Sequence, residues 1–365
     1  MIPPTQRFGT RSWIRWFGPA LALAGWPALG RAAPPSAPGT TGPRIISVRK
    51  IWDQAPHNAF TDLIRFKDKW FCTFRESVAH VGGDGKLRVL VSPDGQEWTS
   101  AALLAEHGID LRDPKLSITP DGRLMIVAGG SVYEGRRLVG RQPRVAFSRD
   151  GLTWMPTQRV LNEGDWLWRV TWHNGRAYGT SYRLVDLDKG KNPKDQDWEL
   201  ALYCSPDGLH YERITNLAVT DQPNETTLRF LPDGTMMALV RREAGNRCGW
   251  IGVSRKPYTQ WTWHETKHRL GGPNFIVLPD GSMWAAGRSH VGDVRTILAR
   301  MGPDTYEPVL TVPSGGDCSY PGLAWHDGLL WMSYYSSHEG KSSIYLARIR
   351  LTAAAAPGAP TRAAP

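Results

Sequence analysis

Tight turns recur along this chain at a nearly constant spacing of about 50 residues. Each turn interrupts a hydrophobic run, and Asp-Gly and Asn-Gly favour the left-handed backbone that a hairpin between antiparallel strands requires. The six turns are Lys67-Asp68, Asp121-Gly122, Asn174-Gly175, Asp233-Gly234, Asp280-Gly281 and Asp327-Gly328. They predict an all-β fold, a six-bladed β-propeller with four-stranded antiparallel blades, in which equivalent positions of all blades face one central pocket.

A second motif has the same period but a different phase. It reads SPDGQEW at 92–98, SRDGLTW at 148–154 and SPDGLHY at 205–211, with a degraded copy, SRKPYTQW, at 254–261. The Ser and Asp side chains can bond nearby backbone N–H groups, and the aromatic residue can pack into the outer layer of a blade. The motif resembles the Asp-box, or BNR repeat, of the sialidase (neuraminidase) superfamily. Because the motif is structural, this resemblance concerns the fold more than the activity.

The N-terminus has the features of a secretory signal peptide. Three arginines precede an apolar stretch at 16–29, and small residues follow at 30–32. A membrane anchor is the alternative, but about 14 apolar residues interrupted by two prolines are too short for a span. We therefore expect removal of residues 1–32, a secreted or periplasmic protein and no membrane insertion.

Composition divides the rest of the chain. Pro, Gly, Ser and Thr dominate 33–43, which predicts a disordered linker, and the tail 352–365 is similar. The segment 44–351 is left as one propeller domain, expected to be a monomer. Removal of four arginines with 1–32 lowers the formal net charge from +10 to +6, and no Lys/Arg run suggests a nucleic-acid partner.

The cysteines and glycine clusters indicate no cofactor and no metal. Cys72, Cys204, Cys248 and Cys318 are widely spaced and fit no metal-ligand pattern. In an oxidising compartment they could pair in three ways, or they could remain packed free thiols. The glycine clusters match turns rather than phosphate-binding loops.

The charged residues recur at one phase of the repeat. About eight residues before and after each turn, strand ends should meet on one rim, and many of these positions are arginines or aromatic residues. The predicted substrate-binding residues there are Arg75, Arg112, Arg169, Arg241, Arg288, Trp168, Asn274 and Tyr335. Arginines from several blades around one opening predict an anion-binding pocket, with an acidic glycan (a sialoside or a uronate) as the partner.

At this rim the resemblance to sialidases extends to single residues. The stretch DQPNETTLRFLPDGTMMALVRR resembles the family segment in which an Asn-Glu pair opens a strand and an arginine closes its partner. The resemblance implies that Glu225 assists a tyrosine nucleophile, that Tyr320 in CSYPGLAWHDG is that nucleophile, and that Arg241 and Arg288 bind the substrate carboxylate. It also puts Arg75 near a further binding arginine. The implied activity is exo-sialidase cleavage with retention, through a glycosyl–tyrosine intermediate.

Two family features are missing. The first arginine of the sialidase triad should fall near HNAFTDLIRF at 57–66, where Phe60 or a neighbour takes its place. Either Arg75 or Arg112 compensates, or the substrate is not a sialic acid. The acid/base aspartate has no clean match either. Asp113, which corresponds to a pocket aspartate of the family, Asp84 and His80 are the candidates for protonating the leaving oxygen.

Two other functions fit the same residues. A uronate-directed polysaccharide lyase could use arginines to acidify a C5 proton and a histidine or tyrosine to abstract it, and His57, His80 and His173 lie near the rim. A non-catalytic glycan-binding propeller would explain the many tryptophans and the missing acid/base. A double bond in the products would distinguish a lyase from a hydrolase.

Overall fold

The computed structural model describes residues 42–184 and 197–351, and these form strands and connections without a helix. Hence no helix within those ranges is long and apolar enough to cross a membrane. The expected signal peptide 1–32, nearly all of the expected linker 33–43 and the expected tail 352–365 lie outside the described residues.

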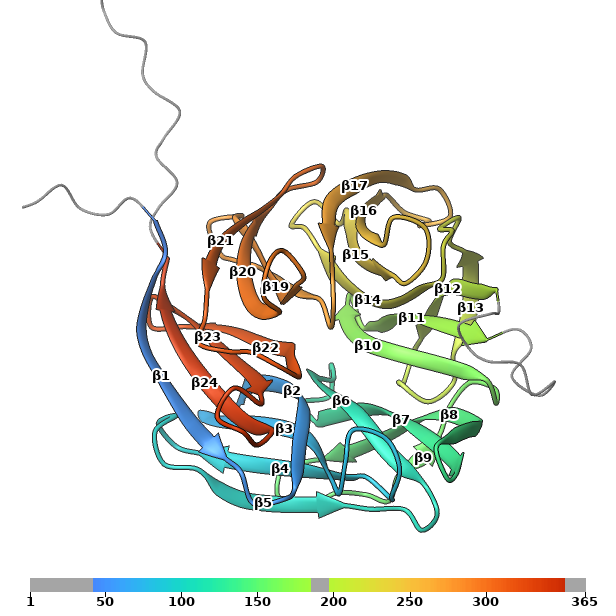
Figure 1. The fold of residues 1–365 in the computed structure, drawn as a ribbon. Coiled ribbons are helices and arrows are strands. Elements are labelled where there is room, and N and C mark those ends of the chain that lie inside the picture. The colour runs from blue at the N-terminus through green and yellow to red at the C-terminus, as the bar shows by residue number, and fades with distance from the viewer. Residues whose placement is uncertain (1–41, 185–196, 352–365) are drawn as a thin grey trace, which may run out of the picture. The chain divides into compact units, whose positions relative to one another are not determined.

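Twenty-four strands form six antiparallel sheets of four within the described residues, arranged as the blades of a propeller (Figure 1). This confirms the predicted fold class. Blade 1 consists of β2 (His57–Phe66), β3 (Lys69–Ser77), β4 (Lys86–Ser92) and β5 (Thr99–Leu104). Blade 2 consists of β6 (Asp110–Ile118), β7 (Leu124–Glu134), β8 (Arg137–Ser148) and β9 (Gln158–Arg159). Blade 3 consists of β10 (Asp165–His173), β11 (Arg176–Leu184), β12 (Trp198–Ser205) and β13 (Glu212–Asn216).

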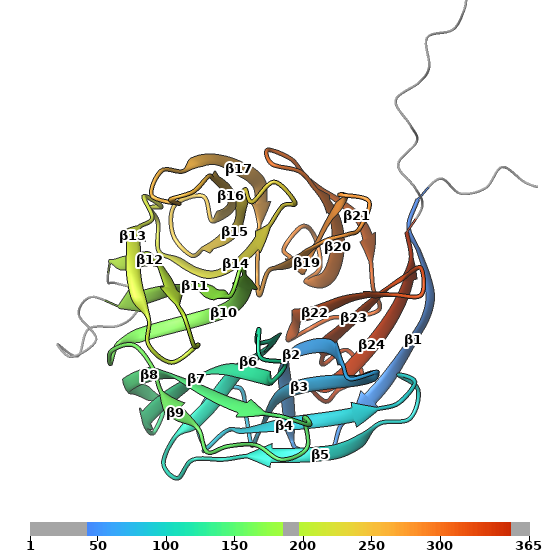
Figure 2. The ribbon, with the colours of Figure 1, turned by 180° about the vertical axis from the view of Figure 1, so that it is seen from behind.

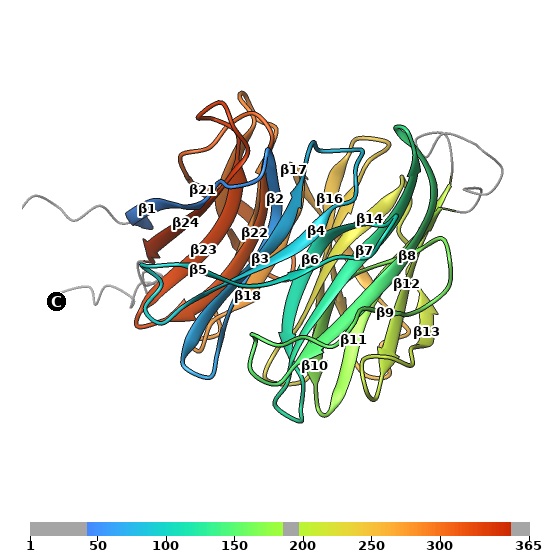
Figure 3. The ribbon, with the colours of Figure 1, turned by 90° about the horizontal axis from the view of Figure 1, so that it is seen from below.

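The remaining three blades complete the ring. Blade 4 consists of β14 (Pro223–Phe230), β15 (Met236–Arg242), β16 (Cys248–Ser254) and β17 (Thr262–Arg269). Blade 5 consists of β18 (Asn274–Val277), β19 (Met283–Ser289), β20 (Arg295–Met301) and β21 (Tyr306–Thr311). Blade 6 consists of β22 (Cys318–His326), β23 (Leu329–Ser336), β24 (Ser343–Arg350) and β1 (Arg44–Trp52). Figure 3 shows neighbouring sheets packed face to face.

Blade 6 joins both ends of the described domain. Its outer strand β1 pairs antiparallel with β24, with Arg44 opposite Arg350, and Figure 2 shows the two side by side. The turn pattern did not predict this pairing, because β1 belongs to no hairpin. Closure in this way pairs the first strand of the domain with its last strand, which joins the ends of the ring.

The six predicted turns lie where the sequence put them, between the first and second strands of each blade. Asn174 and Gly175 have φ of 48° and 77°, and Asp327 and Gly328 have φ of 49° and 68°. These positive values are the left-handed conformations that make Asn-Gly and Asp-Gly suitable for two-residue hairpins.

The Ser-x-Asp-Gly loops lie between the third and fourth strands of blades 1, 2 and 3. In the first of them the Ser92 hydroxyl accepts a hydrogen bond from the Gly95 N–H at 2.8 Å, and the Asp94 carboxylate accepts one from the Gln96 N–H at 2.8 Å. The indole of Trp98 donates to the Gly95 carbonyl at 3.1 Å. The loops therefore have the structural role expected of them.

The four cysteines are free thiols. Cys72, Cys204 and Cys318 are buried, and Cys248 is partly exposed. Burial raises the pKa of the Cys72 thiol, so this side chain packs as a small neutral group. Of the two alternatives that the sequence left open, the structure has the packed free thiols.

Blades 6 and 1 approach so closely at Gly322 that we expect Gly322→Ala to destabilise the domain. A Cβ atom there would lie 2.2 Å from the backbone nitrogen of Leu63 and 2.6 Å from the carbonyl carbon of Asp62. Backbone cannot move aside cheaply, so the free energy of unfolding should fall by at least about 3 kcal/mol. Urea unfolding measures the change. Gly42→Ala, where a Cβ atom meets nothing within 4 Å, should change it by less than about 0.5 kcal/mol.

Candidate active site

A register break lies in the innermost strand of five blades, close to one rim. In β2 it falls between Ala59 and Asp62, in β6 between Arg112 and Lys115, and in β22 between Ser319 and Gly322. The extra residues include three with left-handed backbones, namely Phe60 (φ 65°), Asp113 (φ 54°) and Tyr320 (φ 53°). Bulges turn side chains away from the regular pleat, so Phe60, Asp113 and Tyr320 occupy equivalent, re-aimed positions in blades 1, 2 and 6, respectively.

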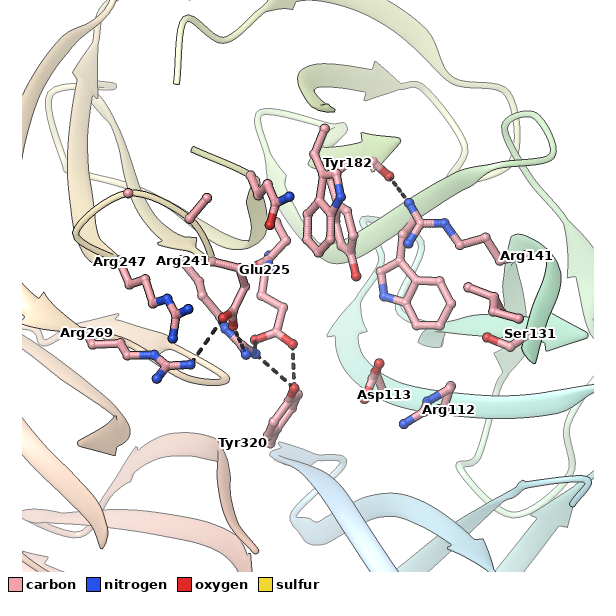
Figure 4. Close-up of a pocket in the computed structure, with 18 of the residues that line it drawn as sticks. Arg112, Asp113, Ser131, Arg141, Tyr182, Glu225, Arg241, Arg247, Arg269 and Tyr320 are labelled. Atoms are coloured by element: carbon pink, nitrogen blue, oxygen red, sulfur yellow. Dashed lines mark hydrogen bonds and ion pairs between the residues drawn. The ribbon is translucent and has the colours of Figure 1, made fainter. Parts of the chain in front are cut away.

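A pocket of about 820 Å³ opens at this rim. Figure 4 shows Tyr320 at its base, with Glu225 and Arg241 on one side and Asp113 and Arg112 on the other. Its remaining charged and aromatic lining includes Tyr133, Arg141, Trp166, Tyr182, Trp198, Glu243, Arg247 and Arg269. The pocket thus collects side chains from blades 2, 3, 4 and 6.

A short hydrogen bond at the base joins a tyrosine to a glutamate. The Tyr320 hydroxyl donates to Glu225 Oε1 at 2.5 Å, and Arg241 Nη1 lies 2.7 Å from Glu225 Oε2 and 3.2 Å from the Tyr320 oxygen. The backbone N–H of Gly272 donates to Glu225 Oε2 at 2.9 Å. The glutamate is therefore oriented by three donors and aligned with the phenol. The sequence predicted that these residues would meet.

The protonation states follow from these contacts. Burial opposes the charge on Glu225, but Arg241 and the hydrogen bonds outweigh it and lower the pKa of Glu225 below its ordinary value. Burial, and then the charge of Glu225, raise the pKa of Tyr320 well above its ordinary value. The resting pair is a neutral phenol beside a carboxylate. Such a phenol can attack only as its proton passes to Glu225.

Asp113 is the carboxyl group best placed to act as an acid. It is 8% exposed, and its Oδ1 is buried without a hydrogen-bond partner among the described residues. Burial raises the pKa of Asp113 despite the opposing charges of Arg112 and Lys115. A raised pKa keeps a proton on the carboxyl group at higher pH, which a general acid requires.

One wall of the pocket is cationic. Arg241 and Arg269 both pair with Glu243, the latter at 3.2 Å. Arg247 is exposed, and its guanidinium makes no hydrogen bond or ion pair with the described residues. This wall therefore has three arginines but only two carboxylates, Glu225 and Glu243, so its net charge is positive.

The opposite wall combines arginines with aromatic rings. Arg141 donates to the carbonyl oxygens of Gly164 and Tyr182 and lies 4.6 Å from the Tyr182 ring centroid. Tyr182 in turn stacks on Trp198 at 5.6 Å. Arg112 donates to the Tyr133 hydroxyl at 2.9 Å. Flat rings beside donors are a common surface for sugars.

Several predicted binding residues lie outside the pocket. Arg75 is fully buried and forms a two-bond ion pair with Asp110 at 2.6 and 3.0 Å. Arg169 is buried against Asp62 at 2.8 Å. Asn274 is buried and donates to the Pro321 carbonyl. All three are buried and bonded to protein groups, so the geometry gives them a structural rather than a substrate-binding position.

The other predicted residues are close to the pocket without lining it. Trp168 is 1% exposed, so it is packed against Tyr320 rather than open to a sugar. Arg288 donates to the Cys318 carbonyl and the Tyr335 hydroxyl and lies 3.5 Å from Asp317. At this position the resemblance implied a carboxylate-binding arginine, but here a protein carboxylate already approaches it.

The two remaining acid/base candidates are not in the pocket lining. Asp84 Oδ2 accepts a hydrogen bond from the Gly108 N–H. His80 is about half exposed and bonds to Asp317 at 2.7 Å. Of the three candidates, only Asp113 lines the same pocket as Tyr320.

The sequence reasoning missed Arg141, Arg247, Arg269 and Glu243. Arg141 is on the third strand of blade 2, and the others come from the outer half of blade 4 and its loops. In the sequence, the hairpin turns mark the ends of only the two innermost strands of each blade. Outer strands and loops lack such a marker, although their residues also line the pocket.

Lys115 is a buried cation beneath Tyr320, and we expect it to make stability pH-dependent. Its ammonium lies 4.7 Å from the Trp168 ring and 5.6 Å from the Tyr320 ring. Burial, and then the charge of Arg169, lower the pKa of Lys115 from 10.5 to about 8. Between these two pKa values the unfolded chain binds a proton that the folded chain does not, so stability rises with pH there.

The neutral variant Lys115→Met isolates this effect. From about pH 8 to about pH 9.5, the unfolding free energy of the wild type should rise by about 1.5 kcal/mol relative to the variant. Urea unfolding of both proteins at the two pH values measures it. Parallel changes in the two proteins would mean that Lys115 does not titrate in this range.

No protein-family model and no curated protein matches this chain. Among solved structures, a Dyadobacter fermentans protein of unknown function matches with a TM-score of 0.75 at 18% identity, over 86% of this chain and 100% of its own. An α-L-arabinofuranosidase of Fusarium graminearum matches with a TM-score of 0.64 at 14% identity, over 84% of this chain and 98% of its own.

Trypanosoma rangeli sialidase matches with a TM-score of 0.63 at 12% identity, over 80% of this chain and 55% of its own. The chain has the same propeller fold as these proteins. The resemblance to the sialidase superfamily is thus confirmed at the level of the fold. At these identities the shared fold does not define the substrate.

Proposed function

We propose that the protein is a retaining, exo-type glycoside hydrolase that removes a terminal acidic sugar from a glycan, and that it acts outside the cytoplasm after loss of residues 1–32. The observation that carries this proposal is the 2.5 Å hydrogen bond from Tyr320 to Glu225 at the base of an arginine-lined pocket. The glycosidase structures that share the fold support the reaction class. An arginine that contacts both members of the pair, Arg241, supports an anionic substrate.

The reaction has two steps. In the first, the Tyr320 oxygen bonds to the anomeric carbon while its proton passes to Glu225, and the bond to the leaving oxygen breaks as Asp113 protonates that oxygen. In the second, water attacks the anomeric carbon, its proton passes to Asp113, and Tyr320 leaves with the proton returned by Glu225. Two displacements retain the anomeric configuration. A neutral nucleophile suits a sugar with a carboxylate near the anomeric carbon, because an anionic one would be repelled.

The acid group of the sugar would be bound by Arg241 with Arg247 and Arg269. The guanidinium of Arg247 has no partner among the described residues, and a planar fork can bind a carboxylate through two parallel hydrogen bonds. The sialidase arrangement is incomplete, since Phe60 stands where its first arginine is expected and Arg288 lies near Asp317. A uronic acid or a related acidic sugar is therefore included with sialic acid in the proposed substrate class.

Phe60 at the position of the first arginine and the Arg288–Asp317 contact favour a second candidate function, hydrolysis of a neutral pentofuranoside. If Phe60 and the Arg288–Asp317 contact exclude a carboxylate, Glu225 itself would be the nucleophile and Tyr320 would orient it. A Penicillium chrysogenum arabinanase with the same fold was solved with arabinobiose, at a TM-score of 0.62 and 13% identity. This candidate makes Arg247 and Arg269 unnecessary for turnover.

Mass spectrometry of released sugars tests the proposal. The full chain is incubated with sialylated glycoproteins, uronate-rich polysaccharides and arabinan, alongside an Arg247→Ala/Arg269→Ala variant. Release of a saturated acidic monosaccharide by the wild type, reduced at least about tenfold in the variant, is the expected result. If both proteins release arabinose alone, and in equal amounts, the acidic-sugar proposal is wrong and the second candidate function replaces it. An unsaturated product would indicate a lyase, and no product from any substrate would favour a glycan-binding propeller.

A further inference from the structure

Outside the pocket, two histidines and an aspartate from three separate segments meet at one point. His57 begins β2, His80 lies in the loop after β3, and Asp317 directly precedes β22. His57 Nε2 lies 3.2 Å and His80 Nδ1 lies 2.7 Å from Asp317 Oδ2, and the three potential ligand atoms lie within 4.8 Å of one another. The proposed reaction uses none of these groups.

We propose that His57, His80 and Asp317 form a binding site for a divalent transition-metal ion of the zinc class. Two imidazole nitrogens and one carboxylate oxygen are a common set of protein ligands for zinc at sites that keep a fourth position open. In a tetrahedral zinc site the ligand atoms lie about 3.3 Å apart, because each is about 2.0 to 2.2 Å from the metal. The His57–Asp317 separation of 3.2 Å is close to this value, and the His57–His80 separation is at most 4.8 Å. His80, whose side chain is 48% exposed, can rotate to lengthen its 2.7 Å separation from Asp317 and to adjust its distance from His57.

The surroundings hold the carboxylate in the orientation that a ligand needs. The Tyr335 hydroxyl donates to Asp317 Oδ1 at 2.7 Å and Arg288 approaches the same oxygen at 3.5 Å, so Oδ2 is left facing the histidines. Side chains that bind a ligand's second oxygen in this way orient metal ligands. His57 is held among aromatic rings, with Phe60 at 6.2 Å between ring centroids. Two of the three ligands are thus fixed before a metal binds.

The site adjoins the pocket without belonging to its lining. The Phe60 ring packs against His80 at 5.2 Å and Tyr320 at 4.9 Å, and Arg112 donates to the His80 carbonyl at 3.3 Å. A metal there would put a positive charge on the side of Tyr320 where Phe60 replaces an arginine. Its open position, next to the exposed His80, could take a water or a substrate oxygen. The metal site itself does not depend on the proposed function.

Titration with Zn²⁺ tests the site, using the full chain without a tag after treatment with a chelator. Isothermal titration calorimetry should give one site per chain with a dissociation constant below about 1 µM. His80→Ala and Asp317→Asn should each weaken binding at least about 100-fold. Co²⁺ in place of zinc should give the visible absorption bands of a four-coordinate ion, which these variants should lose.

The chain offers a matched control. His210 Nδ1 lies 2.7 Å from Asp207 Oδ2, the same separation as in the His80–Asp317 pair, but no third ligand from the described part of the chain joins them. His210→Ala should bind Zn²⁺ like the wild type, and far-ultraviolet circular dichroism should show every variant folded. If Asp317→Asn does not fold, His80→Ala decides, because His80 is on an exposed loop. Absence of binding, or binding that His80→Ala leaves unchanged, would overturn the proposal.

Discussion

Replacing Tyr320 by phenylalanine should reduce kcat/KM for the substrate identified by sugar release at least about 1000-fold. The ring of Tyr320 packs against Phe60, Trp168 and Tyr335, and phenylalanine preserves these contacts. Only the hydroxyl is lost, and with it the atom that would bond to the anomeric carbon. Steady-state kinetics of the purified variant measures the effect, and thermal unfolding confirms that the fold is kept.

Tyr133→Phe is the matched control for this experiment. Tyr133 also lines the pocket, and its hydroxyl accepts a hydrogen bond from Arg112 at 2.9 Å, but it is not bonded to Glu225. Loss of the Tyr133 hydroxyl should lower kcat/KM by less than about tenfold. Mass spectrometry after reaction with a slow fluorinated substrate should place the sugar on the peptide that contains Tyr320. A sugar on the peptide that contains Glu225, with Tyr320→Phe still active, would make the glutamate the nucleophile.

Asp113→Asn should lower turnover of natural glycans by about 100- to 10,000-fold, the usual contribution of a general acid. The amide cannot donate its proton to the leaving oxygen. For substrates whose leaving group needs no protonation, such as a nitrophenyl glycoside, the variant should therefore show a much smaller decrease in the rate of the first step. Burial raises the pKa of Asp113, so the wild-type activity should fall as pH rises through that pKa, and the variant should lack this fall.

Asp84→Asn serves as the control for the acid. The Asp84 carboxylate accepts from the Gly108 N–H and does not line the pocket, so this variant should keep the wild-type rate and pH profile. An equal loss for both leaving groups in Asp113→Asn would assign Asp113 to binding or positioning rather than to proton transfer. Loss of activity in Asp84→Asn would mean that the acid comes from the loop of blade 1 in the bound state.

The pattern of the sequence was enough to predict the six blades. A hairpin turn requires particular backbone angles, and Asn-Gly and Asp-Gly at the tips reveal them locally, so the six turns predicted six blades. The repeat also placed Tyr320, Glu225 and Arg241 on one rim, because each lies on one of the two innermost strands of its blade, at a fixed distance from a turn. Their grouping was implied by the resemblance to sialidases.

Other features depend on contacts between distant segments. The pairing of β1 with β24 joins the two ends of the domain, and no local pattern marks it. The same holds for the buried ion pairs of Arg75 and Arg169, which look like free rim arginines in the sequence. A carboxylate from a neighbouring blade or strand decides whether an arginine is available to a substrate, and its approach cannot be read from spacing alone.

The sequence by itself thus determined the number of blades and the rim that carries the pocket, because turn chemistry and strand period are local properties, and its resemblance to sialidases implied the Tyr–Glu–Arg group at the base. Only the tertiary structure decided which arginines remain available, that Asp113 rather than Asp84 or His80 lines the pocket, and that His57, His80 and Asp317 meet. His57 and His80 are 260 and 237 residues from Asp317. Ring closure, bulges and loop curvature bring such residues together, and these depend on packing across the whole domain.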